Sequence, residues 1–219
     1  MGKEINLLRN YPKANRNLDN RSKNKTNKIV RIARKFGKDF FDGDRKYGYG
    51  GFIYNKKYWS KVVVDFKNYW KLTSKNSLLD VGCGKGFMLY DLKKIIPSIK
   101  IAGIDISKYA IKNACSSVKK FLKIGNAKKM SFADKSFDYV ISINTIHNLP
   151  KSECASALRE IQRISNKGSF VVVDAYRNLK EKKRMMKWNL TAKTIMSVKQ
   201  WKLFFKKNGY RGDYYWFIP

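Results

Sequence analysis

Short apolar runs alternate with amphipathic segments from residue 77 to the end of the chain. In SECASALREIQRIS, for example, Cys154, Ala157, Leu158 and Ile161 share one face of a helix. Strands that alternate with helices predict a mostly parallel sheet with helices on both faces, and such sheets bind ligands at the carboxyl ends of their strands. The sequence shows six strands, at 77–82, 100–106, 121–126, 137–144, 169–176 and 212–218.

A turn with three glycines follows the first expected strand, in LLDVGCGKGF. Gly82, Gly84 and Gly86 leave the backbone bare, so a ligand can approach the main chain closely. A dinucleotide-binding turn needs the pattern G-x-G-x-x-G, but Phe87 stands where the last glycine would fall. Asp105 ends the next strand, and a carboxylate there can accept both ribose hydroxyls of an adenosine in either kind of ligand.

The chain from about residue 75 to residue 219 resembles the class I S-adenosylmethionine-dependent methyltransferases. The resemblance rests on four motifs in order: Asp80 with the glycine turn, Asp105 in AGIDIS, Gly125-Asn126-Ala127, and FDYVISINTIHNL. It implies an α/β, Rossmann-like sheet of seven mostly parallel strands, the last of them antiparallel. One strand is therefore missing from the six that the sequence shows.

The resemblance also implies S-adenosylmethionine as the cofactor. Asp80 would accept hydrogen bonds from the methionine amino group, and Asp105 would hold the ribose. Asn126 replaces the family's usual Asp; its amide oxygen can still accept from the adenine amino group, although Asn is also a common turn residue. The implied cofactor-binding residues are Asp80, Gly82, Cys83, Gly84, Gly86, Asp105, Ile106, Asn126, Ala127 and Asn144.

Three residues after the fourth and fifth strands are candidates for catalysis. His147 is the only histidine, and its ordinary pKa of about 6.5 suits a general base; a His that caps the loop or stacks near the adenosine is the alternative. Asp174 and Tyr176 could contact the methyl acceptor, or they could anchor a loop.

Residues 29–74 are expected to form a helical, Gly- and Tyr-rich extension, with helices at 29–41 and 56–71. The loop between these helices has the composition of a lid that closes over cofactor and acceptor, or of an arm that only packs on the sheet. The Met- and Lys-rich segment 177–196 could be a substrate cap or core. The expected acceptor contacts are Arg45, Tyr47, Tyr49, Tyr54 and Trp188.

The net charge of +32 raises the question of a nucleic-acid partner. Of the 48 basic residues, 37 are Lys and 11 are Arg, and the lysines are scattered along the chain. Arg is the better residue for bidentate phosphate and base contacts, so this mixture favours an AT-rich coding bias. The D/N-P-P-Y/F signature of base-amine methyltransferases is also absent after the fourth strand. Nucleic acid is thus possible but not favoured.

Three distant cysteines and one histidine predict neither disulfides nor a metal site. The chain has no run of about 18 apolar residues and no signal-peptide pattern, so we expect a cytoplasmic protein without a membrane segment. Residues 1–28 are polar and aperiodic, which predicts an arm that is mobile or draped over the domain.

These features predict a methyltransferase of residues 75–219 that acts on a small polar or anionic metabolite, such as a sugar or nucleotide-sugar intermediate. The alternatives are an RNA methyltransferase and a non-catalytic S-adenosylmethionine-binding protein. GDRKYGYGGF and SINTIHNL also resemble a bacterial group of methyltransferase-domain proteins with no assigned acceptor. The acceptor atom and the oligomeric state are not predicted.

Overall fold

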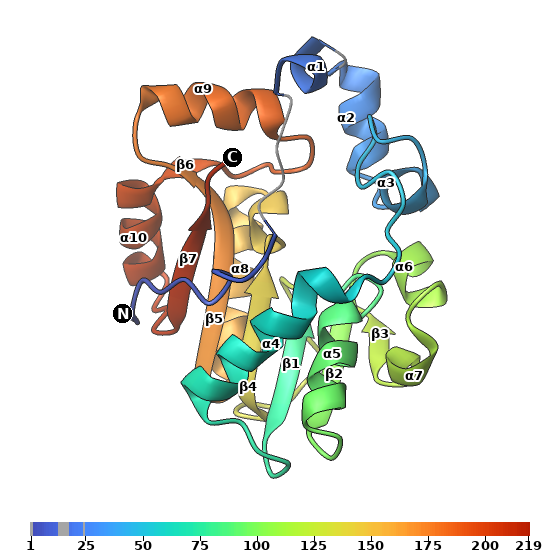
Figure 1. Cartoon of the computed structure of the whole chain (residues 1–219). Helices are drawn as coiled ribbons and strands as arrows, with labels where there is room; N and C mark the ends of the chain where they lie inside the picture. The colour runs from blue at the N-terminus through green and yellow to red at the C-terminus, as the bar shows by residue number, and fades with distance from the viewer. Residues whose placement is uncertain (1, 13–17, 24) are drawn as a thin grey trace.

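A central parallel sheet lies between two layers of helices in the computed structural model, which describes residues 2–12, 18–23 and 25–219 (Figure 1). The strand order is β3-β2-β1-β4-β5, and both β6 and β7 pair with β5. The strands are β1 Ser77–Val81, β2 Lys100–Asp105, β3 Leu122–Ile124, β4 Phe137–Ile143, β5 Ser165–Tyr176, β6 Met196–Ser197 and β7 Asp213–Phe217.

The last strand corrects one expectation. β7 runs parallel to β5, with Phe170 opposite Asp213 and Asp174 opposite Phe217, so the expected antiparallel strand is wrong. The reason is the helix before it. α10 starts beside the carboxyl end of β5 and returns the chain to the amino-terminal end of the strands before β7 begins. The strand missing from the sequence prediction is β6, whose two residues are too few to show a strand pattern.

The helices differ in detail from the predicted ones. The helix expected at 29–41 is divided at Phe36, whose φ of 50° is left-handed. In the described residues the helices are α1 Leu18–Lys23, α2 Asn27–Ala33, α3 Lys38–Asp42, α4 Lys56–Trp70, α5 Phe87–Ile95, α6 Lys108–Lys112, α7 Ser116–Lys119, the 3-10 helix η1 Ile146–Asn148, α8 Lys151–Ile164, α9 Leu179–Trp188 and α10 Val198–Lys207.

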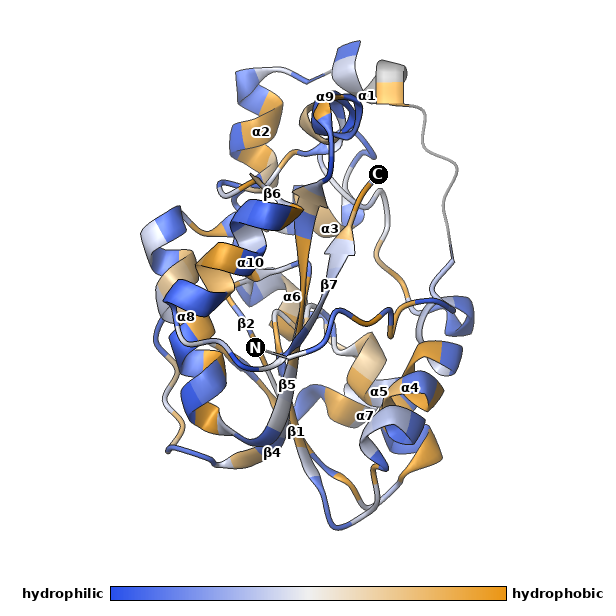
Figure 2. Cartoon of the chain, turned by 90° about the vertical axis from the view of Figure 1, so that its left-hand side faces the viewer, coloured by the Kyte–Doolittle hydropathy of each residue, from blue (hydrophilic) through white to orange (hydrophobic). Residues whose placement is uncertain are grey.

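Two apolar cores, one on each face of the sheet, hold the layers together. Side chains alternate between the faces of a strand, so Phe170 and Val172 of β5 pack with α4 and α5, whereas Val171 and Val173 pack with α8 and α10. Figure 2 shows apolar stretches on β5 and on the neighbouring helices. Because both faces of the sheet are covered, only the strand ends can receive a ligand.

The N-terminal arm is draped over the domain where the structure describes it. Glu4 bridges to Tyr214 of β7, and Arg9 binds the buried Asp65 of α4 with an N–O distance of 2.7 Å. Residues 13–17 and 24, within the predicted polar arm 1–28, lie outside the described residues, as does residue 1. None of the helices described is both long and apolar enough to traverse a lipid bilayer.

Candidate functional site

The carboxyl ends of β1, β2, β4 and β5 bring the predicted site residues to one edge of the sheet. The glycine turn follows β1, Asp105 ends β2, the 144–148 loop follows β4, and Tyr176 ends β5. In Figure 1, α2, α3 and α9 stand at this same edge. The parallel register of neighbouring strands is what places residues so distant in sequence side by side.

The glycine turn has a backbone that only glycine adopts easily. The φ angles of Gly82, Gly84 and Gly86 are 90°, 55° and 77°, all in the left-handed region. A Cβ on Gly82 would overlap the Thr145 side chain, and one on Gly86 would lie 2.7 Å from Leu122 Cδ1. The turn is thus locked against its neighbours as well as bare toward a ligand.

Two carboxylates flank the turn. Asp80 is buried, and its carboxylate finds no hydrogen-bond partner in the part of the chain that the structure describes. Burial, and secondly the charge of Asp105, raise the pKa of Asp80 to about 7. Asp105 accepts from the Gly84 N–H and the Ser107 N–H, both at 2.8 Å, and these bonds oppose the rise that burial causes in its pKa. A cationic donor at the turn would therefore find an unpaired acceptor in Asp80.

The residues expected around the adenine differ in their exposure. Ile106 is 54% exposed at the end of β2, so its side chain is free to pack against a flat ring. Ala127, which follows Asn126, is buried. Asn126 Oδ1 accepts the Lys128 N–H at 3.1 Å, so the turn already uses one of its lone pairs.

Cys83 and Asn144 have mainly backbone roles. The Cys83 side chain is buried against Gly103, its N–H donates to the Ile104 carbonyl at 3.0 Å, and burial raises the pKa of its thiol. Asn144 has a left-handed φ of 53°, and its N–H donates to the Val172 carbonyl at 3.0 Å.

His147 and Asp174 form a buried pair. His147 Nδ1 accepts the Asp174 N–H at 3.1 Å, and its Nε2 lies 3.6 Å from Asp174 Oδ2. Burial lowers the pKa of His147 despite the nearby carboxylate. Because both ring nitrogens face Asp174, this geometry favours a structural role for His147, and its role as a base stays a prediction.

The Asp174 end of β5 also holds the chain that follows α9. Asp174 Oδ2 accepts from Asn189 Nδ2 at 2.6 Å, and the His147 carbonyl accepts from the N–H groups of Lys193 and Thr194, both at 3.0 Å. Tyr176 differs from this buried group because it is partly exposed, and the Lys182 ammonium lies 5.6 Å from its ring centre. Among the three predicted catalytic residues, Tyr176 is the one open to solvent.

The four lid residues predicted before α4 lie differently from one another. Tyr49 lies close enough to Asp105 to feel its charge: burial of the hydroxyl, and secondly the charge of Asp105, raise the pKa of Tyr49 to about 12, although 47% of the residue's surface is exposed. Tyr54 donates to Asp91 of α5 at 2.6 Å. Arg45 donates to the Gly48 carbonyl within its own loop, and Lys46 lies over the Tyr47 ring.

The two regions expected to bind the acceptor contact each other. Arg34, just after α2, donates to the carbonyls of Thr191 and Ala192 at 3.3 and 3.0 Å, and α1 packs on α9. Trp188 ends α9, with its ring 6.2 Å from that of Phe217. The N-terminal helices and the 177–196 segment therefore form one helical layer at the carboxyl ends of the strands.

Sequence reasoning missed several residues that build this site. Asp42 of α3 binds Lys85 of the glycine turn, and Phe52 lies 3.3 Å from an ideal Cβ on Gly84. Lys85 could have been noticed as the lysine between two glycines of the turn, but nothing local in the sequence points to Asp42 as its partner.

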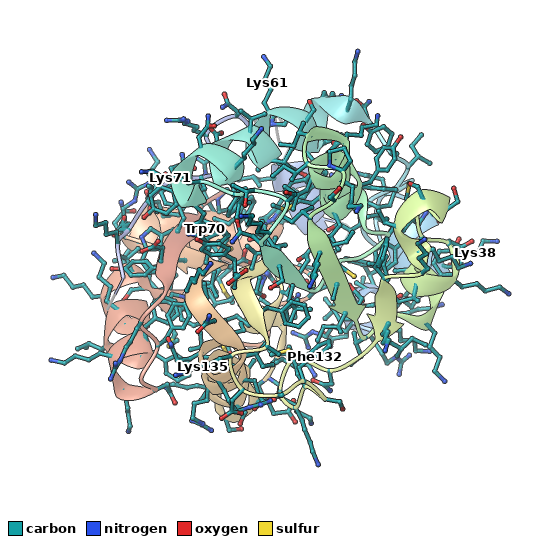
Figure 3. The ribbon with its side chains drawn as sticks, turned by 90° about the horizontal axis from the view of Figure 1, so that it is seen from below. Lys38, Lys61, Trp70, Lys71, Phe132 and Lys135 are labelled. Carbon is teal, nitrogen blue, oxygen red and sulfur yellow. The ribbon has the colours of Figure 1, made fainter. Side chains whose placement is uncertain are left out.

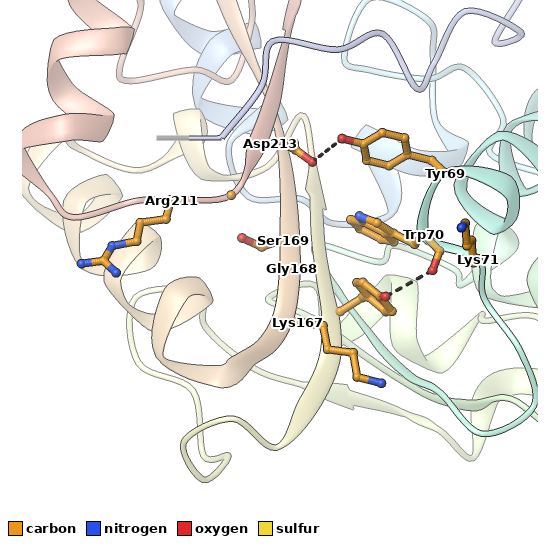
Figure 4. Close-up of a pocket in the computed structure, with 10 residues that line it drawn as sticks. Tyr69, Trp70, Lys71, Lys167, Gly168, Ser169, Arg211 and Asp213 are labelled. Atoms are coloured by element: carbon orange, nitrogen blue, oxygen red, sulfur yellow. Dashed lines mark hydrogen bonds between the residues drawn. The ribbon is translucent and has the colours of Figure 1, made fainter.

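A pocket of about 450 Å³ lies at the opposite edge of the sheet (Figure 4). Its walls come from the end of α4 and from the amino-terminal parts of β4, β5 and β7, and Trp70 stacks on Tyr139 there with ring centres 4.5 Å apart. None of the predicted site residues lines this pocket. We therefore place the candidate site at the strand ends, where the motifs meet, and not in this pocket.

Comparison with known proteins identifies the family of the chain. A family model described as "Methyltransferase domain" matches residues 72–209. Demethylmenaquinone methyltransferase of Staphylococcus aureus is 32% identical over 121 residues, which are 53% of this chain and 48% of that protein. The chain thus spans about half the length of the curated relatives it matches.

Two solved structures share the fold at low identity. One is a Haemonchus contortus phosphoethanolamine N-methyltransferase with phosphomonomethylethanolamine and S-adenosylhomocysteine (TM-score 0.58, 18% identical, 81% of this chain and 44% of that one). The other is the [4+2]-cyclase SpnF (TM-score 0.57, 20% identical, 68% and 56% covered). With its matching domain, its parallel sheet and its acidic glycine turn, the chain belongs to the methyltransferase-domain family, of the class I S-adenosylmethionine-dependent type.

Proposed function

We propose that the chain transfers the methyl group of S-adenosylmethionine to a small molecule. The observation that supports this most directly is Asp80, a buried carboxylate without a partner among the described residues, next to a bare glycine turn and to Asp105. An ammonium group on the turn would pair with Asp80 and hold its pKa below the value of about 7 that burial imposes.

The remaining cofactor contacts follow from the positions of the strand ends. Asp105 would accept the ribose hydroxyls with the lone pairs that Gly84 and Ser107 leave free. Ile106 would cover one face of the adenine, and the free lone pair of the Asn126 amide oxygen would accept from its amino group. S-adenosylmethionine would supply a methyl group on a sulfonium, and alignment of such a group with an acceptor can be worth about 7–11 kcal/mol.

The acceptor would lie between the end of β5 and the helical layer formed by the N-terminal helices and the 177–196 segment. Tyr176 is the predicted catalytic residue placed to contact it, because His147 and Asp174 face each other. Arg184 of α9 has no ion-pair partner among the described residues and lines a hollow of about 310 Å³ with Lys180, Lys183 and Lys187. These cations lie on the exposed side of α9, where Leu18 of α1 completes the hollow, and they would attract a polar or anionic acceptor such as a sugar or nucleotide-sugar intermediate.

A flat, quinone-like acceptor is the second candidate. The observation that favours it is a set of aromatic rings beside the glycine turn, where Phe52 lies 4.3 Å from Tyr49 and 5.0 Å from Phe87, centre to centre. Demethylmenaquinone methyltransferase, the relative matched over about half of its length, is named for a quinone of this kind. An apolar, ring-lined acceptor site would distinguish this candidate from the anionic one.

An RNA acceptor is less favoured by the distribution of charge. In the view of Figure 3, Lys38, Lys61 and Lys135 stand on different sides of the molecule, as scattered lysines would and as a binding stripe would not. Tight tRNA or rRNA binding at physiological salt would revive this alternative.

Calorimetry and a labelling experiment test the proposal together. Purified protein should release heat with S-adenosylhomocysteine and not with NADH, and Asp105→Ala should abolish that binding. A cell extract with labelled S-adenosylmethionine should then yield a labelled metabolite, identified by mass spectrometry, only when the wild-type protein is added. NADH binding without S-adenosylhomocysteine binding would contradict the proposed cofactor. Cofactor binding without any labelled product would favour the non-catalytic alternative.

A further inference from the structure

Asp42 gathers more hydrogen bonds than any role in its own short helix requires. The chain has 16 acidic residues against 48 Lys and Arg, so each partly buried carboxylate has many possible cationic partners. Asp42 ends α3, and its two oxygens accept from Lys85 Nζ at 2.9 and 2.7 Å, from the Phe52 N–H at 2.8 Å and from the Tyr109 hydroxyl at 2.8 Å. These bonds hold the pKa of Asp42 below its usual value, although burial opposes them.

Lys85 makes this contact specific to the glycine turn. It lies between Gly84 and Gly86, is only 6% exposed, and forms its ion pair with Asp42 at 2.7 Å. A buried ammonium without a partner is unfavourable, so the turn in this conformation needs a carboxylate at the position of Asp42. The Lys85 carbonyl accepts the Cys115 N–H at 3.0 Å, which leaves the backbone of the turn little freedom.

The other two partners of Asp42 lie against cofactor-binding elements as well. Phe52 places its ring over Gly84, and Tyr109 lies on α6, directly after the Asp105 end of β2. Ser107, two residues after Asp105, donates its hydroxyl to the Phe36 carbonyl at 2.5 Å. Residues 36–52 are therefore bonded both to the turn and to the ribose-binding end of β2.

We propose that Asp42 is a positioning residue for the cofactor: through Lys85 and Tyr109 it fastens residues 36–52 to the glycine turn and sets the geometry in which the turn receives S-adenosylmethionine. This inference rests on the proposed function, because it assigns the turn to that cofactor. It also makes the N-terminal extension a wall of the cofactor site, in addition to its place beside the acceptor. Loss of the Asp42 contacts leaves Asp80 and Asp105 in place but makes the backbone of the glycine turn, residues 82–86, more mobile.

The test compares three variants with a matched control. Asp42→Asn removes the carboxylate of the Asp42–Lys85 ion pair, and Lys85→Met removes its ammonium group. The double variant removes both charges and so leaves no unpaired buried charge. Asp39→Asn makes the same change on an exposed residue of the same helix. The measurements are S-adenosylhomocysteine affinity by calorimetry, thermal unfolding, and hydrogen–deuterium exchange of residues 36–52 and 82–86 without ligand.

We expect Asp42→Asn to weaken S-adenosylhomocysteine binding about tenfold, the usual consequence of losing one charge-assisted hydrogen-bonded contact. Asp39→Asn should bind like wild type. The double variant should regain thermal stability relative to the single variants without regaining affinity, since a purely structural pair would recover both. Exchange should rise in 36–52 and in 82–86 together.

Two results would overturn the inference: wild-type affinity in Asp42→Asn, or exchange that rises in 36–52 and leaves 82–86 unchanged. The exchange measurement needs no cofactor, so it decides whether Asp42 fastens the two segments even if the wild-type protein binds no S-adenosylhomocysteine. Absence of S-adenosylhomocysteine binding in the wild-type protein would contradict the proposed function, but it would leave the contact between residues 36–52 and the glycine turn intact.

Discussion

The two halves of the candidate site are built by different means. The cofactor half consists of backbone at the ends of adjacent strands, with left-handed glycines and two carboxylates. The proposed acceptor half consists of helices from the two ends of the chain, joined by side-chain contacts such as Arg34 to the Thr191 and Ala192 carbonyls. The comparison teaches that a motif can identify the cofactor half, because its residues are local, whereas the acceptor half depends on long-range contacts that can vary without loss of the fold.

The largest expected effect belongs to the backbone of the cofactor half. Gly82→Ala should destabilise the protein by about 4 kcal/mol, since the new Cβ meets Thr145 and the left-handed φ adds strain. Gly209→Ala is the matched control: its φ is 68°, nothing lies within 4 Å of a new Cβ, and about 1 kcal/mol is expected. Urea unfolding measures both. Equal losses of unfolding free energy in the two variants would show that contact with Thr145 does not restrict Gly82.

A second test uses the pH dependence that Asp80 confers. Its pKa in the folded protein is about 7, above the ordinary value of 3.8, so the folded state binds the proton more tightly than the unfolded state does. Stability from this group is fully present below about pH 4 and is lost as the pH rises through about 7; the loss should be about 4 kcal/mol, from about 1.36 kcal/mol for each unit between the two pKa values.

Urea unfolding of wild type and Asp80→Asn between pH 4 and pH 8 isolates this contribution. The decline with rising pH should be shallower in Asp80→Asn, and S-adenosylhomocysteine should reduce the decline in wild type by giving Asp80 an ammonium partner. Parallel stability profiles for the two proteins would show that Asp80 is not the buried acceptor described above.

The acceptor half is tested through His147. His147→Ala removes the acceptor of a buried Asp174 N–H and should cost about 2 kcal/mol of stability, whereas His147→Gln, which retains an acceptor, should cost less. If the role is structural, kcat in His147→Gln should fall by less than about tenfold, below the 10²–10⁴-fold that general-base catalysis contributes. A loss of more than about 100-fold with unchanged stability would instead assign the base to His147.

The smallest effect is expected where the loop before α4 contacts α5. Tyr54→Phe removes a hydrogen bond of 2.6 Å to Asp91 Oδ1 and should lower stability by about 1 kcal/mol, with little change in cofactor affinity. Tyr47→Phe serves as the control, because the Tyr47 hydroxyl has no hydrogen-bond partner among the residues described. Thermal unfolding and calorimetry separate the two readouts. A large loss of cofactor affinity in Tyr54→Phe would show that Tyr54 contacts the ligand and does not only anchor the loop to α5.

Local pattern was enough to predict the elements that position the cofactor. Continuous apolar runs predicted β1, β2, β4 and β5, and the glycines of the turn do adopt the left-handed conformations for which glycine is suited. Prediction failed where local propensity was overridden or too weak. Phe36 divides a helix that periodicity favoured, and β6 has two residues.

The sequence by itself determined the parallel α/β sheet, the acidic glycine turn and the carboxylate at the end of β2, because each depends on residues within a few positions of one another. Only the tertiary structure decided the direction of β7, the mutual engagement of His147 and Asp174, and the pairing of Asp42 with Lys85 across 43 residues. Such contacts form when packed layers bring distant segments together, and burial then decides which charged groups must find a partner.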